Sequence, residues 1–239
     1  PIQTYGRQPL SGTLEYAVEM DGKEYKRGSS EAGAEVTVNV ETSAGNHTFR
    51  IYATNAYGQS LATEATAYAG PDTLKAVGDL KAEKSADGVE ISWTAPTETQ
   101  NGGWFDPANV TYTVTRTQDG KTIAQGLKAT SCRDAVGGEP MRAYTYSVTP
   151  YQGDLAGEPA MTDAVAVGSY CTMPWKDDFN DSATWVMYTV HNLKEGTRTW
   201  EYDEGRQSAT VDYDRKDPKD DWLMTPGLKM SANRTYKLE

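Results

Sequence analysis

Residues 110–123, VTYTVTRTQDGKTI, alternate apolar and polar side chains up to an Asp-Gly pair and then continue as a second extended run. Alternation with period two places the apolar side chains on one face of a strand, and Asp-Gly favours a tight hairpin turn. Residues 14–25, LEYAVEMDGKEY, repeat the arrangement about 100 residues earlier, a separation typical of one domain. The stretch therefore predicts a β-hairpin, and its repetition predicts two copies of one all-β domain.

Further alternating runs carry this pattern along the chain. Strands are predicted at 35–40 (EVTVNV), 47–55 (HTFRIYATN), 88–93 (GVEISW) and 144–151 (YTYSVTPY). Helical patterns are nearly absent, and short strands separated by turn residues favour immunoglobulin-like β-sandwiches. The second copy begins with residues 80–97, for which the first copy has no counterpart, so we expect the first domain to lack its first two strands.

The composition restricts the classes of partner. The 239 residues carry 23 basic and 34 acidic side chains, a net charge of -11, which argues against nucleic acid and anionic membranes as partners. No apolar run approaches the roughly 18 residues of a membrane-spanning helix. No signal peptide is present, so an export signal would lie upstream of these residues. Cys132 and Cys171 lie in different predicted modules, and we expect two unpaired thiols.

Two segments of the second copy resemble fibronectin type III domains. GVEISWTAPT (88–97) resembles the second strand of that family, in which Trp93 would anchor the core and Pro96 would end the strand. YTYSVTPYQGDLAG (144–157) resembles a later strand, with Tyr144 at the position of the tyrosine corner. The resemblance implies rod-like modules that act as spacers or binding domains.

The resemblance extends over about residues 10–168 and sets the expected domains. It divides this part into an incomplete domain at 1–70 and a complete one at 71–168. In the first copy His47 stands at the tyrosine-corner position, and we expect it to be a hydrogen-bonded structural residue rather than a ligand.

After Gly168 the pattern changes to irregularly spaced aromatic residues. This part resembles the beginning of the cleaved-adhesin and choice-of-anchor J jelly-roll modules on surface proteins of Bacteroidetes-like bacteria. The matching residues are PWKDDF (174–179), Trp185, Trp200 and DWLMTP (221–226). The resemblance implies that residues 169–239 are the N-terminal part of such a module, on an extracellular or cell-surface protein. Trp93, Trp185, Trp200 and Trp222 all lie in strand-like contexts and are expected in cores.

The acidic residues of this last part are candidates for binding calcium. Calcium prefers several carboxylate and carbonyl oxygens supplied by loops, and related jelly rolls commonly hold structural calcium. Asp178 and Asp221 are the ligands we would choose. The alternative is a solvated loop of neighbouring opposite charges, because KDPKDD (216–221) interleaves lysines with the acids. Asn180 stands where family members often carry Glu, which departs from the metal-binding pattern.

A Gly-rich loop in the second copy, NGGWFDPANVTY (101–112), carries two adjacent aromatic residues, Trp104 and Phe105. Aromatic side chains in such a loop can stack on a sugar ring or insert into a protein partner. The alternative is that Trp104 folds back over the end of the sandwich and plugs its core. The sequence leaves both interpretations open.

Motifs of catalysis are scarce. The two histidines, His47 and His191, lie in different predicted modules, so no histidine-based triad or two-histidine zinc site forms within one domain. Together with this scarcity, the resemblances described above imply a non-catalytic adhesion or ligand-binding protein of a bacterial surface, whose partner is a host or matrix protein or a glycan. The alternative is a set of accessory modules of a larger secreted protease or glycan-degrading enzyme.

Overall fold

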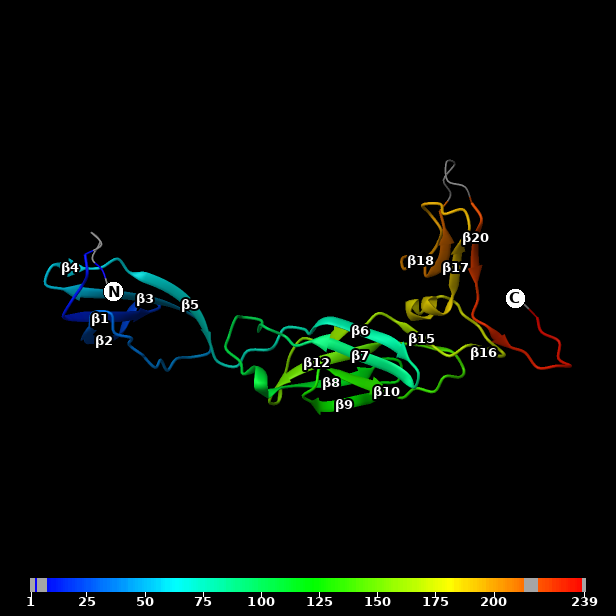
Figure 1. Cartoon of the computed structure of the whole chain (residues 1–239), viewed down its shortest axis with the longest axis horizontal. Coiled ribbons are helices and arrows are strands. Elements are labelled where there is room, and N and C mark those ends of the chain that lie inside the picture. The colour runs from blue at the N-terminus through cyan, green and yellow to red at the C-terminus, as the bar shows by residue number, and fades with distance from the viewer. Residues whose placement is uncertain (1–2, 4–7, 213–218, 238–239) are drawn as a thin grey trace. The chain divides into compact units, whose positions relative to one another are not determined.

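The computed structural model describes residues 3, 8–212 and 219–237. The chain forms two compact units, which are described separately below. The first consists of residues 1–73 together with 98–106, and the second consists of residues 74–97 together with 107–239. Strands dominate both units (Figure 1), as the alternating sequence predicted.

The first unit is built on one antiparallel sheet. Its strands are β1 (Thr13–Met20), β2 (Lys23–Glu31), β3 (Gly45–Asn55), β4 (Gly58–Gln59) and β5 (Thr63–Ala69). The sheet order is β2-β1-β3-β4, with β5 also pairing to β3. Asp21 and Gly22 connect β1 to β2 with φ angles of 52° and 77°, the positive values that a tight hairpin turn requires. The hairpin predicted at 14–25 is therefore confirmed.

The strand predicted at residues 35–40 is not formed. Residues 35–44 have no regular structure, and the Val36 side chain is 42% exposed. In the second copy the equivalent strand, β10 (Ser131–Asp134), pairs with β7 (Gly88–Thr94) alone. The described part of the first unit contains no counterpart of β7, so the alternating pattern at 35–40 has no neighbouring strand to bond with. This prediction was wrong because a β-strand forms only where a neighbouring strand supplies hydrogen-bond partners for its backbone.

The second unit contains a β-sandwich of two antiparallel sheets (Figure 1). One sheet has the order β10-β7-β6, where β6 is Gly78–Ser85. The other has the order β13-β12-β8-β9, with β14 pairing to β12. Its strands are β8 (Val110–Arg116), β9 (Thr122–Leu127), β12 (Tyr146–Gln152), β13 (Leu155–Ala156) and β14 (Ala160–Met161). A 3-10 turn, η1 (Pro107–Asn109), precedes β8, and β11 (Arg142–Tyr144) pairs with β15 (Val165–Val167).

The inner faces of these two sheets form the core. Alternate residues of β7 and β8 are buried, and the Trp93 and Tyr112 rings meet edge to face with centroids 5.2 Å apart. Tyr146 and Val148 of β12 are fully buried on the same face. Packing of this kind and this strand order define an immunoglobulin-like sandwich of the fibronectin type III kind. The predicted fold class and the core position of Trp93 are confirmed.

The remainder of the second unit consists of short strand pairs. A parallel pair joins β16 (Cys171–Thr172) to β21 (Leu228–Lys229), and antiparallel pairs join β17 (Thr189–Asn192) to β20 (Asp221–Met224) and β18 (Trp200–Asp203) to β19 (Ser208–Val211). A six-residue 3-10 helix, η2 (Ser182–Met187), lies between β16 and β17. Among the residues that the structure describes these pairs do not merge into a larger sheet, so the jelly roll stays a prediction.

Aromatic rings around Tyr188 hold this part together. Phe179 and Trp185 stack on the Tyr188 ring with centroids 5.4 and 5.7 Å away, and Trp175 lies at 6.0 Å. The Tyr188 hydroxyl donates a hydrogen bond to Asp177 at 3.0 Å. The PWKDDF motif therefore supplies a local cluster in which each aromatic residue has a packing role.

Not every tryptophan expected in a core is buried. Trp200 is half-buried and donates its indole N–H to the Asp221 carbonyl at 3.3 Å. Trp222 is 59% exposed, so the core prediction for it was wrong. Along β20, Asp221 and Leu223 are half-buried, and Trp222 and Met224 on the opposite face are exposed. Only one face of this strand is packed in the described part of the chain, and Trp222 lies on the other.

Two further predictions can be compared with the structure. Cys132 and Cys171 are free thiols, as expected. Within the described ranges, no helix combines the length and the apolar character that crossing a membrane requires.

Candidate functional site

The loop between β7 and β8 displays Trp104 to solvent. The Trp104 side chain is 82% exposed, although Phe105 next to it is partly buried. The interpretation of Trp104 as a core plug was therefore wrong. At this exposure Trp104 gains little of the free energy that burial normally gives a large apolar side chain. The structure of the loop around it explains why the side chain nevertheless points to solvent.

A buried aspartate anchors the loop. Asp72 is only 5% exposed. One of its carboxylate oxygens accepts hydrogen bonds from the backbone N–H groups of Asn101 and Gly103, both at 2.9 Å, and the other accepts from the Asn101 side-chain amide at 2.8 Å. The Thr99 hydroxyl donates to the Gly103 carbonyl at 2.9 Å and closes the turn from inside. The loop is thus held by a charged acceptor that lies about thirty residues earlier in the chain.

The protonation state of Asp72 fits this role. Burial by itself would raise the pKa of its carboxyl group. The neighbouring Thr99 hydroxyl and the hydrogen bonds donated by Gly103 and Asn101 outweigh burial and lower the pKa to about 2. The carboxylate is therefore ionised at neutral pH, which is the state that accepts several donors at once.

Two glycines make the tight approach possible. Gly102 has a φ of +76°, in the left-handed region that favours glycine. At Gly103 an added Cβ would lie 2.9 Å from the Asp72 Cβ and 3.1 Å from a ring carbon of Tyr68. Only a residue without a side chain lets the backbone reach the carboxylate so closely. The two glycines of NGGWF thus shape the support for Trp104.

The arrangement can bind a partner through an aromatic contact. An exposed indole on an anchored loop backbone offers stacking area for a sugar ring or an anchor for a pocket on a protein, and little backbone entropy is lost when it is engaged. Sequence reasoning found Trp104 and Phe105 from the Gly-rich loop but missed Asp72. The signal was weak, since nothing in the local sequence indicates which donors an aspartate far along the chain will meet.

The buried histidine of the first unit has a structural role, as predicted. The His47 ring is 8% exposed, and its Nδ1 lies 2.7 Å from an Asp21 carboxylate oxygen. Its Nε2 lies 3.0 Å from the Ser43 carbonyl and 3.1 Å from the Thr42 hydroxyl. The Asp21 hydrogen bond and the Ser43 carbonyl raise the pKa of His47. Both ring nitrogens are thus held by hydrogen-bonding neighbours, so the ring links the β1–β2 turn to the segment before β3.

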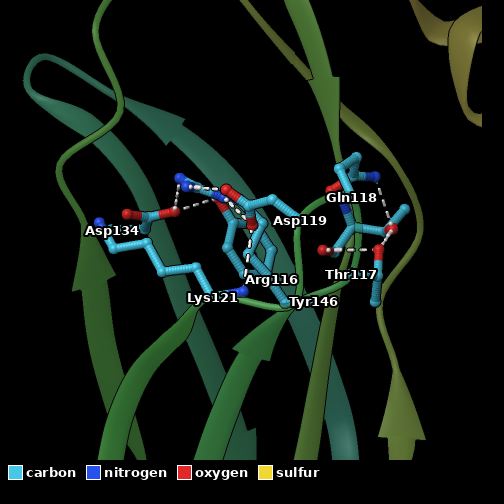
Figure 2. A network of polar contacts seen from close by, with 8 residues as sticks. Arg116, Thr117, Gln118, Asp119, Lys121, Asp134 and Tyr146 are labelled. Carbon is cyan, nitrogen blue, oxygen red and sulfur yellow. Dashed lines mark hydrogen bonds and ion pairs between the residues drawn. The ribbon is translucent and has the colours of Figure 1, made fainter.

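An ionic network lies at one end of the sandwich (Figure 2). The Arg116 guanidinium donates to Asp134 at 2.8 Å and makes a two-fold contact with Asp119, at 2.6 and 3.0 Å. The Tyr146 hydroxyl, fully buried, donates to the same Asp134 oxygen at 3.1 Å. Burial and the neighbouring Asp134 raise the pKa of Tyr146. The Arg116, Asp119 and Asp134 charges all have an opposite partner, which is typical of a stabilising network. Tyr146, two residues after the predicted corner residue Tyr144, is the tyrosine that anchors this end.

The structure does not bring the two predicted calcium ligands into one cluster. Asp178 accepts a hydrogen bond from the Asn180 backbone at 3.2 Å and lies 3.9 Å from the Lys176 ammonium. The side chain of Asp221, unlike the residue as a whole, is almost completely buried, and its carboxylate lies 3.7 Å from the Lys219 ammonium. The described residues include no group of three or more histidine, cysteine or acidic side chains able to hold a metal ion. Residues 213–218, which include the first half of the charged run, lie outside the described residues. Calcium binding stays a prediction.

Comparisons with known proteins identify solved structures of similar fold but do not assign the chain to a family. No protein-family model matches the chain, and a search of curated proteins finds no match. Similar solved structures include the FN1–FN3 domains of chicken CNTN1 (12% identity, TM-score 0.31, 70% of this chain and 58% of that one). Others are three consecutive domains of titin (14%, 0.32, 64% and 54%) and domains d3–d4 of the rat CD45 extracellular region (14%, 0.33, 57% and 72%).

These matches are distant. The chain spans little more than half of the first two structures, and the identities and TM-scores carry no information on function. The assignment of the fold therefore rests on the strands of this chain and their pairing.

Proposed function

We propose that the chain is a non-catalytic binding segment of an extracellular or cell-surface bacterial protein, in which the Trp104 loop contacts a glycan or a host or matrix protein. The observation that carries the proposal is the combination of an 82% exposed tryptophan with a loop fixed on a buried carboxylate. Loops held on a rigid scaffold are the usual location of binding residues in proteins. Phe105, partly buried next to Trp104, is proposed to contribute to the same contact.

The fibronectin-like domains at 1–70 and 71–168 are proposed as spacers, and residues 169–239 are proposed as a further, jelly-roll recognition module. Support for a binding role over catalysis comes from the polar groups described above. His47 has acceptors on both ring nitrogens, and Arg116 is fully engaged by Asp134 and Asp119. Such groups stabilise the fold and leave recognition to the surface.

The proposal is tested with the whole chain on a glycan array and on a panel of immobilised matrix proteins. Trp104→Ala is compared with Tyr57→Ala, which removes another exposed aromatic side chain (97%) of the first unit outside the loop. We expect Trp104→Ala to weaken binding at least tenfold, in keeping with the ~2 kcal/mol typical of an anchor residue, and Tyr57→Ala to leave it unchanged. Binding that survives Trp104→Ala would contradict the assigned site, and absence of binding to every probe would contradict the function.

A further inference from the structure

A pocket of about 430 Å³ lies at one end of the second sandwich, next to the ionic network of Figure 2. Three segments border it: the β8–β9 turn with Gln118 and Asp119, strand β11 with the preceding Met141, and the 3-10 helix η2 with its capping residue Asp181. Because three separate segments surround it, the pocket suits a compact ligand better than an extended chain. Its volume falls within the range of roughly 300–1,000 Å³ that is typical of small-molecule sites.

The turn that borders the pocket is held in place by hydrogen bonds within the sandwich. The Gln118 amide donates to the Thr145 hydroxyl at 2.9 Å and accepts from the Thr145 backbone N–H at 3.1 Å. Asp119 is fixed by its two-fold contact with the Arg116 guanidinium, whose side chain is only 12% exposed. A pocket with such an ordered wall loses less conformational entropy when a ligand binds.

Two polar side chains of the pocket retain hydrogen-bonding capacity. Arg142 is exposed, and within the described part of the chain its guanidinium makes no hydrogen bond or ion pair. Asp181 accepts a hydrogen bond from the Ala183 backbone N–H at 3.0 Å through one carboxylate oxygen. Its other oxygen has no donor among the described residues. The pocket therefore offers donors from Arg142 and an acceptor from Asp181.

Apolar surface lies beside these polar groups. Tyr144 is half-buried, with the Arg116 guanidinium 5.5 Å from its ring centroid. Met141 and Met187, also half-buried, line the pocket with it. An aromatic ring and flexible thioether side chains can pack against the C–H face of a ligand. The pocket thus combines an apolar surface with groups that donate and accept hydrogen bonds.

The charges of the pocket favour a neutral ligand. Two guanidinium groups line it, those of Arg116 and Arg142, together with two carboxylates, those of Asp119 and Asp181. Because these charges balance, neither an anion nor a cation gains an electrostatic advantage. A sugar ring meets each requirement, since it is neutral and compact, its hydroxyl groups both donate and accept, and one of its faces is apolar.

We propose that this pocket binds one ring of a neutral sugar. Neighbouring hydroxyl groups of the sugar are held by Arg142 and Asp181, and its C–H face packs against Tyr144 and Met187. The pocket belongs to the second unit, whereas the Trp104 loop belongs to the first, so this site does not depend on the proposed function.

The test titrates the whole chain with glucose, galactose, mannose and N-acetylglucosamine as neutral probes, and with glucuronic acid and glucosamine as charged ones. Binding is followed through backbone amide shifts in NMR spectra, which also locate the ligand. Arg142→Ala is the disrupting variant, because its guanidinium makes no contact in the described part of the chain that the change would remove. Arg133→Ala is the matched control, since it removes another arginine, with 52% of its side chain exposed, from a strand that does not line the pocket.

We expect a neutral sugar to shift the amides of residues 142–144 and 181–184. Arg142→Ala should weaken this binding at least tenfold, and Arg133→Ala should leave it unchanged. Absence of binding by all four neutral probes would overturn the inference, and so would binding of the charged probes alone. Binding that survives Arg142→Ala would equally refute it.

The same spectra separate this site from the Trp104 loop. A sugar that shifts the amides of residues 101–105 and is released by Trp104→Ala would refute the pocket and support the proposed function. A sugar held in the pocket should still bind after Trp104→Ala. On the glycan array, Trp104→Ala is therefore also measured together with Arg142→Ala, so that the failure of one site is not mistaken for the failure of the other.

Discussion

Asp134 should be the residue on which the stability of the second sandwich depends most sharply among its charged groups. It is 3% exposed and accepts hydrogen bonds from both the Arg116 guanidinium and the buried Tyr146 hydroxyl. Removing one member of a buried ion pair costs about 3–5 kcal/mol, and a buried hydroxyl without an acceptor costs about 1–3 kcal/mol. Arg116 retains its two-fold contact with Asp119, which reduces the loss. We therefore expect Asp134→Ala to lower the free energy of unfolding by about 3 kcal/mol.

The assay is amide hydrogen exchange of the buried positions of β8 and β12, which reports on this sandwich alone. A loss of about 3 kcal/mol should reduce protection roughly a hundredfold. Asp134→Asn is the matched variant, because it retains an acceptor for Tyr146 and loses only the charge, so its effect should be clearly smaller. A reduction of less than about threefold for Asp134→Ala, or equal effects of the two variants, would refute the assignment of a buried ionic anchor.

Three more outcomes follow from the described contacts. The folded-state pKa of Asp72 is lowered to about 2, so the stability that the ionised carboxylate contributes is present above the ordinary value of 3.8 and is lost as the pH falls toward 2. Asp72→Asn should therefore speed up hydrogen exchange of the Asn101 and Gly103 amides at pH 7, and the difference from the wild type should vanish near pH 2. The pKa of His47 is raised above 6.5, so the stability that the protonated ring contributes is complete below that value and is lost as the pH rises through the folded-state pKa. The melting temperature of the first unit should therefore fall from pH 6 to pH 9, and His47→Gln should make it depend less on pH. An unchanged pH dependence in His47→Gln would argue against the hydrogen bond to Asp21. Burial raises the pKa of Cys132 to about 11, so alkylation of the native chain at pH 8 should leave Cys132 unmodified and denaturation should expose two reactive thiols; rapid native modification of Cys132, followed by peptide mapping, would contradict its position.

The local sequence predicted correctly those elements whose hydrogen-bonding partner strand lies in the same short stretch of sequence. The hairpin at 14–25 carries both strands and the Asp21-Gly22 turn within one short stretch, and the structure has it. The strand at 35–40 has an equally regular pattern but depends on a neighbour elsewhere, and it did not form. Periodicity reports which face of a strand is apolar and leaves open whether another strand is present to pair with it.

The candidate site was predictable only in part for a related reason. Glycines beside Trp104 indicated a loop, but the choice between an inward and an outward indole depended on Asp72, which is brought close by the fold. Trp222 illustrates the converse, since a strand-like context suggested burial and only one face of its short ladder is packed. Both outcomes were decided by contacts between residues far apart in the chain.

The anchoring of the NGGWF loop separates residues that must stay from residues that can be exchanged. Asn101 and Gly103 are committed to the Asp72 carboxylate, whereas Trp104 contributes almost nothing to the interior. Selection, natural or in the laboratory, can therefore diversify position 104 without disturbing the backbone that presents it. The chain offers a loop in which a new binding specificity can be introduced by replacing a single side chain.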